Sequence, residues 1–410
     1  MILNLRTIIL TLAALSIYYV IFKFNIINYL ALGSNIVFVD YGDIIKALNC
    51  VNFGYSSYSD VHQGPQEMGC RGFSYGPIII DLIPFKKKFF IFYKSIFPIV
   101  LIILFSFLTI FIINPKKNLI LFITFLSLFN PATLLMIQRM NIDILFVILL
   151  ILISYNRIYP LNWFLVIFSF LTKFYPFIYG MIIFMEDKFR NRINLLIIFL
   201  LILFSSFFYM YLNLDKYSYI MNSSWAMGLH YLFSIKILPK IFKELFDLHY
   251  GFLLLLMFGS FIYFNIKLIK KNYKSVLNLD FSSQEKMFVL SSNVVIFCFI
   301  VFSNAYYREV FLILTIPYLL RYLTNHKFKI IINLLIIKLS FNFIYILFLN
   351  FETHYHVDGQ RIYTNSFLFI SFVKGIIDYL LILFISSIAM IKNIKLINHY
   401  FKFKFLEKFN

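Results

Sequence analysis

The chain has 410 residues, 61% of them hydrophobic and only 13% charged, and its formal net charge is +19. Soluble globular proteins carry about 25% charged residues, so this composition excludes an ordinary soluble domain. Repeated apolar runs of about 17–25 residues indicate helices that span a bilayer. We therefore predict an all-α, polytopic integral membrane protein that forms a single transmembrane domain over residues 1–410.

The excess of positive charge has two interpretations. Nucleic-acid binding is one, but here Lys and Arg concentrate in the loops that we place on the cytoplasmic side, which is the usual distribution in membrane proteins. Residues 392–410 are predicted to be a basic, aromatic cytoplasmic tail that lies on an anionic leaflet, with a simply solvated tail as the alternative. We therefore expect membrane lipids as partners and no nucleic acid.

About 12 hydrophobic segments follow one another along the chain, which indicates a multi-pass protein of the plasma membrane. Arg6 precedes the first segment and no convincing cleavage site follows it, so we predict an uncleaved span with its N-terminus inside. Residues 23–88 then form a long first outer loop and 213–250 a second one, and both termini lie inside. The predicted segments are 7–22, 89–113, 119–137, 142–153, 161–171, 174–185, 193–212, 251–269, 287–303, 310–320, 330–350 and 367–391.

Three successive segments, 142–153, 161–171 and 174–185, are too short to span a bilayer. Each has about 11 or 12 residues, whereas a span needs about 17. Pro occurs in both of the separators, SYNRIYP and TKFYP. We expect short or broken helices around a cavity, because irregular backbone at membrane depth must be buried in protein or line a cavity.

Two acidic residues, Asp40 and Asp43, open a helix predicted over 40–52 and ended by Gly54. Residues three apart share a helix face, so both carboxylates can face one cavity, where such a group can act as a general base. The alternative is that acids near a helix start only cap it and favour its dipole. The apolar residues expected to face the membrane from this helix are Ile44, Ile45 and Leu48.

The chain has three cysteines. Cys50 and Cys70 both lie in the first outer loop, and no zinc-binding pattern accompanies them. A disulfide is therefore the natural interpretation for this pair. Cys298 lies inside an apolar run and is expected to be a packing residue.

A polar group, QRMNID, follows the segment that ends at Ile137. It includes Gln138, Arg139 and Asn141. Ionisable groups at such depth usually face a cavity or pair together. A salt bridge between Arg139 and Asp143, four residues apart, is the simple alternative to a binding role.

Two further cations lie in apolar surroundings. Lys173, in TKFYP, can hold a phosphate or extend to the lipid headgroups. Arg308 follows Tyr307 in YYRE, and its guanidinium is suited to bidentate phosphate binding. A salt bridge from Arg308 to Glu309 is the alternative.

Aromatic and imidazole side chains complete the candidates. Phe73 and Tyr75 in CRGFSYGP can stack on a sugar ring, with a plain turn into the next helix as the alternative. His354 and His356 belong to H-x-H-x-D in the last outer loop. A metal site there would need another ligand and a formed cavity, so acceptor binding or simple hydrogen bonding is favoured over metal binding.

Taken in order, these motifs resemble the GT-C class of membrane glycosyltransferases, nearest to family 87, the polyprenol-phosphate-mannose-dependent mannosyltransferase group. The chain departs from that pattern where Ile137 precedes Gln-x-x-Asn, since Gly is common there. The first loop is also longer and carries the Cys pair. The matching motifs are Asp40 with Gly54 and Tyr58, FSYGP (Phe73–Pro77), Gln138 with Asn141, Lys173 with Pro176, and the late turn NAYYREVFLILTIP.

The resemblance implies an inverting transfer of a sugar from a polyprenyl-phosphate donor to a lipid or glycan acceptor at the outer face, with Asp40 as the base. Cations would stabilise the phosphate leaving group. Monophosphate donors in this group need no metal, so no metal or cofactor is expected. The candidate substrate-binding residues are Tyr58, Phe73, Tyr75, Gln138, Arg139, Asn141, Lys173, Tyr307, Arg308, His354 and His356.

Two other functions remain as alternatives. An O-antigen polymerase or ligase usually has its large outer loop late in the chain, whereas the largest loop here is the first. A lipid or polysaccharide transporter is expected to show paired broken helices in two related halves, whereas the short segments here form one cluster. The sequence also has no phosphate-binding glycine motif, no nucleophile elbow and no HExxH, so it does not support soluble-type nucleotide chemistry.

Overall fold

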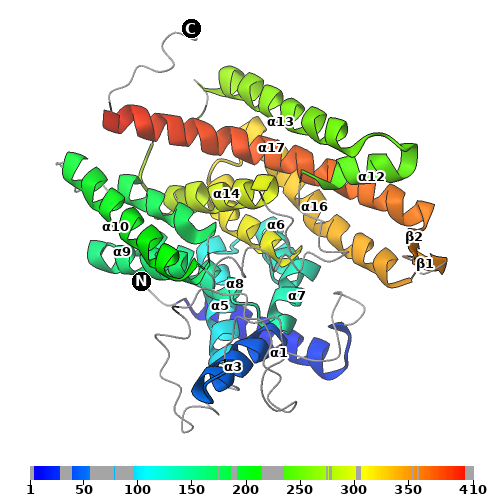
Figure 1. The fold of residues 1–410 in the computed structure, drawn as a ribbon, viewed down its shortest axis with the longest axis horizontal. Coiled ribbons are helices and arrows are strands. Elements are labelled where there is room, and N and C mark those ends of the chain that lie inside the picture. Colours follow the sequence, from blue (N-terminus) through cyan, green and yellow to red (C-terminus); the bar gives the residue numbers. More distant parts are fainter. Residues whose placement is uncertain are drawn as a thin grey trace. The chain divides into compact units, whose positions relative to one another are not determined.

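The computed structural model describes Ile78, Val276 and the ranges 4–27, 39–55, 96–173, 175–185, 192–214, 235–273, 279–301, 306–351, 354–357 and 360–401. Within these ranges the chain is helical apart from one short hairpin (Figure 1). The chain forms two compact units. The first comprises Met1–Ser34, Thr109–Leu135 and Ala226–Asn410, and the second comprises Asn35–Leu108 and Met136–Trp225.

The first unit contains most of the long helices. Its elements are α1 (Leu5–Lys23), α6 (Asn118–Phe129), α12 (Ile237–Phe246), α13 (Tyr250–Asn272), α14 (Ser283–Val301), the 3₁₀ helix η5 (Tyr306–Thr315), α15 (Ile316–Arg321), α16 (His326–Phe351), β1 (His354–Val357), β2 (Gln360–Tyr363) and α17 (Asn365–Phe401).

The second unit contains shorter elements. They are α3 (Val39–Asn52), α8 (Asp143–Tyr155), α9 (Tyr159–Thr172), the 3₁₀ helix η3 (Tyr175–Met185) and α10 (Arg192–Leu212). Two helices, α5 (Phe97–Ile113) and α7 (Pro131–Arg139), contain a boundary between the units.

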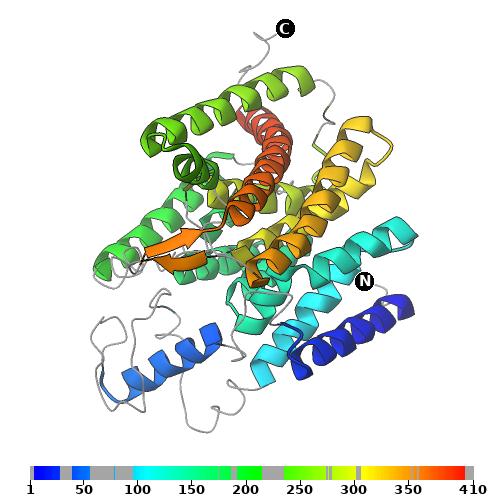
Figure 2. The same ribbon diagram turned by 90° about the vertical axis from the view of Figure 1, so that its right-hand side faces the viewer.

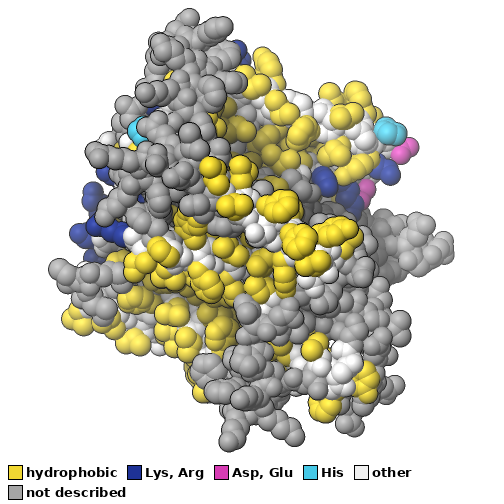
Figure 3. Space-filling model, turned by 60° about the vertical axis from the view of Figure 1, so that its left-hand side comes forward, with side chains coloured by type: hydrophobic (Ala, Val, Ile, Leu, Met, Phe, Trp, Pro, Cys, Tyr) yellow, Lys and Arg dark blue, Asp and Glu magenta, His cyan; other side chains and the backbone are white. Residues whose placement is uncertain are grey.

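Several helices are long and apolar enough to cross a membrane. Among the described residues there are four: Leu5–Lys23, Tyr250–Asn272, Phe328–Phe348 and Asn365–His399. Large apolar side chains on α13, including Phe252, Leu255 and Tyr263, are exposed, as lipid-facing residues are. Hydrophobic side chains cover much of the coloured surface in Figure 3. The helices are therefore those of a multi-pass membrane protein by length and composition.

The segment predicted over 119–137 is not one straight helix. It breaks into α6 and α7, which are bent by 42°. Asn130 stands at the break with extended backbone, and its side-chain Oδ1 accepts a hydrogen bond from the backbone N–H of Ala132 at 3.0 Å. Pro131 begins the new helix, since its missing N–H costs nothing in the first turn. A local cap and a proline therefore decide the break.

The three short segments predicted after residue 141 are confirmed as short elements, namely α8, α9 and η3. Pro160 lies in the first turn of α9, where proline is tolerated. The third segment is a 3₁₀ helix rather than an α-helix. Tyr179 of η3 is fully buried, and its hydroxyl donates to the Phe146 carbonyl of α8 at 3.0 Å, which ties these short elements together.

The start of α14 resembles a capping box, with Ser before the helix and Glu three residues later. Ser282 precedes the helix and its Oγ accepts from the Glu285 N–H at 3.2 Å. Glu285 in turn accepts through Oε2 from the N–H groups of Asp280 and Phe281, both at 2.7 Å. These reciprocal bonds satisfy donors that a helix start leaves unpaired.

The last helix differs from the predicted span and tail. α17 runs to Phe401, so the first part of the predicted tail, 392–401, continues the helix. Lys392 is buried and its Nζ pairs with the Glu285 carboxylate, and Lys395 donates to the Val276 carbonyl. These lysines therefore do not lie on a leaflet surface or in solvent, because each has a partner inside the first unit.

Helices α16 and α17 pack along each other and are joined by the hairpin (Figure 2). Its strands are antiparallel, with His354 opposite Tyr363 and His356 opposite Arg361. The part of H-x-H-x-D at His354–Val357 is thus extended. Apart from this hairpin of two four-residue strands, the regular elements of the described chain are helices, as predicted.

Candidate active site

The carboxylate of Asp40 is the centre of a compact polar cluster in the second unit. Its Oδ1 accepts two hydrogen bonds from Arg139, from Nε at 2.9 Å and from Nη2 at 2.5 Å. Its Oδ2 accepts one from Asn141 Nδ2 at 2.6 Å. The side chain of Asp40 is 11% exposed and that of Arg139 is 36% exposed. Asp40 therefore meets Arg139 and Asn141, which the sequence singled out in a different segment.

The turn between α7 and α8 explains how Arg139 and Asn141 reach the same carboxylate. Met140 has a φ of 48°, in the left-handed region. Its N–H bonds to the Ile137 carbonyl, and the N–H of Asn141 bonds to the Met136 carbonyl, both at 3.0 Å. This pair of bonds is a Schellman motif, which ends a helix and satisfies its last carbonyls. The chain reverses within a few residues, so the end of one helix and the start of the next present their polar side chains together.

The buried face of α3 fixes Asp40 from the other side. Ile44, Ile45 and Leu48 are buried inside the protein, which corrects the prediction that they face the membrane. Tyr41 stacks on Phe97 of α5 with ring centroids 6.0 Å apart. These residues turn inward because α3 is a short helix outside the long spans, and burying its apolar side against protein is favourable. The predicted end of this helix is confirmed, since Gly54 has a φ of +80°.

The two acids of α3 have different surroundings, although three residues separate them. Asp43 is 46% exposed and lies 3.7 Å from Lys46 on the same helix. Asp40 is only 11% exposed and accepts bonds from the turn between α7 and α8. The geometry therefore does not favour the prediction that both carboxylates face one cavity. Asp40 is the better candidate for the general base.

Lys173 forms a buried ion pair with Asp143, the first residue of α8. The Asp143 side chain is 0% exposed and that of Lys173 is 12% exposed. The salt bridge predicted as an alternative, between Arg139 and Asp143, is replaced by two others because the Schellman turn separates those residues. Arg139 bonds to Asp40, and Asp143 bonds to Lys173. Gln138 is buried beside the same turn.

The other predicted site residues lie away from the Asp40 cluster in the sequence or are not among the residues that the structure describes. Arg308 is partly buried in η5 of the first unit, and Cys50 is in a disulfide and fully buried. Cys298 is buried and is not in a disulfide, as expected for a packing residue. The pairing of Cys50 with Cys70 stays a prediction, since Cys70 is not among the described residues. Also outside them are Tyr58, Phe73 and Tyr75, together with the side chains of Tyr307, His354 and His356.

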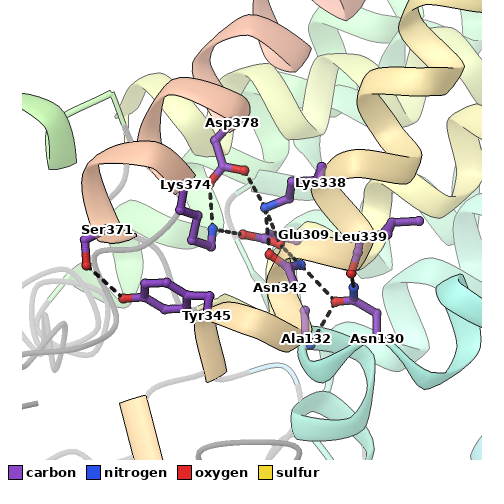
Figure 4. A network of polar contacts seen from close by, with 10 residues as sticks. All are labelled: Asn130, Ala132, Glu309, Lys338, Leu339, Asn342, Tyr345, Ser371, Lys374 and Asp378. Carbon is purple, nitrogen blue, oxygen red and sulfur yellow. Dashed lines mark hydrogen bonds and ion pairs between the residues drawn. The ribbon is translucent and has the colours of Figure 1, made fainter. Parts of the chain in front are cut away.

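A second polar cluster in the first unit was not predicted. Glu309 of η5, Lys338 of α16, and Lys374 and Asp378 of α17 form a closed ring of alternating charge (Figure 4). Glu309 lies 2.7 Å from Lys338 and 3.0 Å from Lys374, and Asp378 lies 2.5 and 2.6 Å from the same lysines. All four side chains are at most 3% exposed. We call this group the charge ring.

Glu309, the alternative partner for Arg308, is itself a member of the charge ring. Glu309 is held by Lys338 and Lys374, and its Oε2 also accepts from Asn342 Nδ2 at 2.9 Å. Asn342 continues the network to Asn130 at 3.0 Å. The signal that could have found the ring is the presence of charged residues within the apolar runs of α16 and α17, since such residues usually pair or serve a function.

No metal site is indicated: among the residues that the structure describes, no three His, Cys, Asp or Glu side chains lie close enough together to hold an ion. Comparison with known proteins gives no guide to identity. No family model, curated protein or solved structure matches the chain. The Asp40 cluster and the sequence motifs therefore remain the features that bear on function.

Proposed function

We propose that this chain is an inverting membrane glycosyltransferase. It moves a sugar, such as mannose or another hexose or a pentose, from a polyprenyl-phosphate donor to a lipid or glycan acceptor at the outer face of the plasma membrane. The observation that supports this most is the largely buried Asp40 carboxylate, oriented by Arg139 and Asn141. A carboxylate held in one orientation by fixed donors is suited to take a proton from a hydroxyl.

The two carboxylate oxygens of Asp40 differ in their capacity to accept a proton from the acceptor hydroxyl. Oδ1 accepts two hydrogen bonds from Arg139, and a carboxylate oxygen has two lone pairs. Among the described residues Oδ2 accepts one bond, from Asn141, and so keeps a lone pair for a substrate proton. The acceptor hydroxyl gives its proton to Oδ2 while its oxygen bonds to the anomeric carbon. The bond from that carbon to the phosphate oxygen breaks, and its electron pair leaves with the polyprenyl phosphate.

The phosphate that leaves needs a cation nearby. Arg139 is suited to this role because its guanidinium lies against Asp40 and its side chain is 36% exposed. A guanidinium presents five N–H donors, so it can hold a carboxylate and a phosphate at once. Lys173, which the resemblance also implies as a phosphate ligand, already pairs with Asp143. Arg139 is thus the cation that the Asp40 cluster offers to the donor phosphate.

Replacing Asp40 tests the proposal directly. Asp40→Asn keeps the size of the side chain but cannot accept the proton, so turnover should fall by about 10²–10⁴ while the protein still folds. Asp43→Asn is the matched control on the same helix and should retain activity. The measurement is release of polyprenyl phosphate from labelled polyprenyl-phosphate sugars by purified protein. Normal turnover in both variants would reject the site, and loss only in Asp43→Asn would move the base to Asp43.

A further inference from the structure

A line of polar contacts runs from Asp40 to the buried pair behind it. Asn141 donates from Nδ2 to Asp40 Oδ2 at 2.6 Å, and its own Oδ1 accepts from the backbone N–H of Asp143 at 3.0 Å. The Asp143 carboxylate accepts from Lys173 Nζ. The side-chain amide of Asn141 therefore has one end on the proposed base and the other on the first residue of α8.

The position of Asp143 is fixed by elements that lie far from it in the sequence. Lys173 follows α9 with extended backbone, and its N–H bonds to the Ser169 carbonyl at 3.0 Å. Its Nζ also lies 5.9 Å from the ring centroid of Phe146, one turn along α8 from Asp143. The start of α8 is thus held by the end of α9.

From this geometry we propose that Asp143 and Lys173 form a positioning pair: through Asn141 they set the orientation of the Asp40 carboxylate. The inference rests on the proposed function for its catalytic consequence. It gives Lys173 a different role from the phosphate ligand implied by the sequence resemblance. A donor phosphate that took Lys173 would leave the fully buried Asp143 without its cation, which is strongly unfavourable.

Burial makes the Asp143–Lys173 pair suitable for holding the Asp40 carboxylate in one orientation. A lysine and an aspartate in solvent exchange partners freely and hold little geometry. Asp143 at 0% exposure and Lys173 at 12% have no such freedom. Displacement of a catalytic group by about 1 Å can reduce a rate about 100-fold, so loss of the pair should be visible in turnover.

The test uses the full-length chain in detergent micelles with four variants. Lys173→Met and Asp143→Asn each break the pair, and Lys173→Arg keeps the charge. The double variant Lys173→Met/Asp143→Leu removes both charges, which usually restores folding because no unpaired buried charge remains. Lys46→Met, in the exposed pair with Asp43, is the matched control.

Two measurements are made on each variant. The first is hydrogen–deuterium exchange of the backbone amides at 140–146, compared with α16 and α17. The second is turnover of polyprenyl-phosphate mannose, separated into kcat and KM. We expect faster exchange confined to 140–146 and a kcat about 10- to 100-fold lower with KM nearly unchanged in Lys173→Met, Asp143→Asn and the double variant. Lys173→Arg should recover part of the exchange protection at 140–146 and part of kcat. Lys46→Met should change neither the exchange nor kcat.

Each contrary result has a distinct meaning. A double variant with unchanged exchange at 140–146 and normal kcat would overturn the positioning role. A large rise in KM for the donor in Lys173→Met at constant kcat would overturn it in favour of direct phosphate binding. Normal turnover in Asp40→Asn would reject the proposed function, whereas the exchange measurement would still decide whether the pair fixes the turn that carries Asn141.

Discussion

Two carboxylates on one helix can be chemically unlike. Asp40 and Asp43 are three residues apart on α3, yet only Asp40 is buried against Arg139 and Asn141. The difference comes from segments about 100 residues further along the chain. At the residue scale, therefore, what a side chain can do is decided by its partners more than by its position on a helix.

Arg308 provides a prediction at this scale. Arg308 is partly buried in η5 and is next in the sequence to Glu309 of the charge ring. Arg308→Ala should weaken binding of polyprenyl phosphate about 10- to 100-fold, since a charge-assisted hydrogen bond contributes about 1.5–3 kcal/mol. Arg308→Lys should recover part of the affinity because it keeps the charge but loses the planar fork. Equal affinity in all three proteins, measured by titration in micelles, would exclude the role.

The disulfide of Cys50 provides a second prediction. Cys298 is buried and not in a disulfide, so Cys70 is the remaining cysteine in the sequence that can pair with Cys50. Alkylation of the denatured, unreduced protein should modify one cysteine, and alkylation after reduction should modify three. Closing a loop of about 20 residues should stabilise the fold by about 3 kcal/mol. A peptide map without a Cys50–Cys70 cross-link would show that the predicted pairing is wrong.

At the element scale, polar contacts and not apolar packing alone fix how the helices of the first unit meet. Lys338 is the central residue of the apolar stretch Phe328–Phe348. It therefore lies about 15 Å from either end, given a rise of about 1.5 Å per residue. Glu309, Lys374 and Asp378 surround it from two other elements. Removing any single member of the charge ring leaves an unbalanced buried charge, so η5, α16 and α17 depend on one another.

The charge ring predicts an unusual order of stabilities. Glu309→Gln leaves two buried lysines with one carboxylate, and should lower the free energy of unfolding by about 3–5 kcal/mol. Replacing all four members with Leu or Met should cost far less or even stabilise the protein, because no charge is then left unpaired. The measurement is thermal unfolding of the purified protein in detergent.

A surface acid serves as the control for this series. Glu244 on α12 lies 4.0 Å from Lys240, and both side chains are partly exposed. Such pairs contribute about 0–1 kcal/mol, so Glu244→Gln should have little effect on unfolding. If Glu309→Gln behaved like Glu244→Gln, the ring would not be a structural element of the first unit.

At the scale of the whole molecule, the number of membrane crossings decides where the chain ends lie. The described helices include four that are long enough to span, or five if the bent pair α6–α7 counts as one span. An even number of spans places both termini on one side, and an odd number places them on opposite sides. The 12 predicted segments also give an even number if all of them cross.

Topology reporters can separate these cases. We predict that reporters at the N-terminus, in the basic stretch 186–192 and at the C-terminus are active inside, because Lys and Arg accumulate in cytoplasmic loops. Reporters within 23–88 and 213–250 should be active outside. An outside signal at the C-terminus alone would support an odd number of crossings. An inside signal from 23–88 would place Asp40 on the wrong face for a lipid-linked donor at the outer surface.

The sequence by itself determined the features that depend on local composition. Hydrophobic runs identify most helices, because lipid and protein interior select the same apolar side chains. Turn and cap signals are also local, so the end of α3 at Gly54 and the short segments after residue 141 were predictable. Asp40, Arg139 and Asn141 could be chosen as candidate site residues from the sequence, because polar residues are rare in an apolar chain.

Only the tertiary structure decided which polar groups meet. Arg139 bonds to Asp40 and not to Asp143, because a left-handed Met140 ends the helix between Arg139 and Asp143. Lys392 is inside the first unit because α17 continues past the end of the apolar run. Pairing in three dimensions depends on helix breaks and on contacts between distant segments. Hydrophobic periodicity contains no information about helix breaks or about contacts between distant segments. The charge ring and the pairing of Lys173 with Asp143 could therefore not be predicted from it.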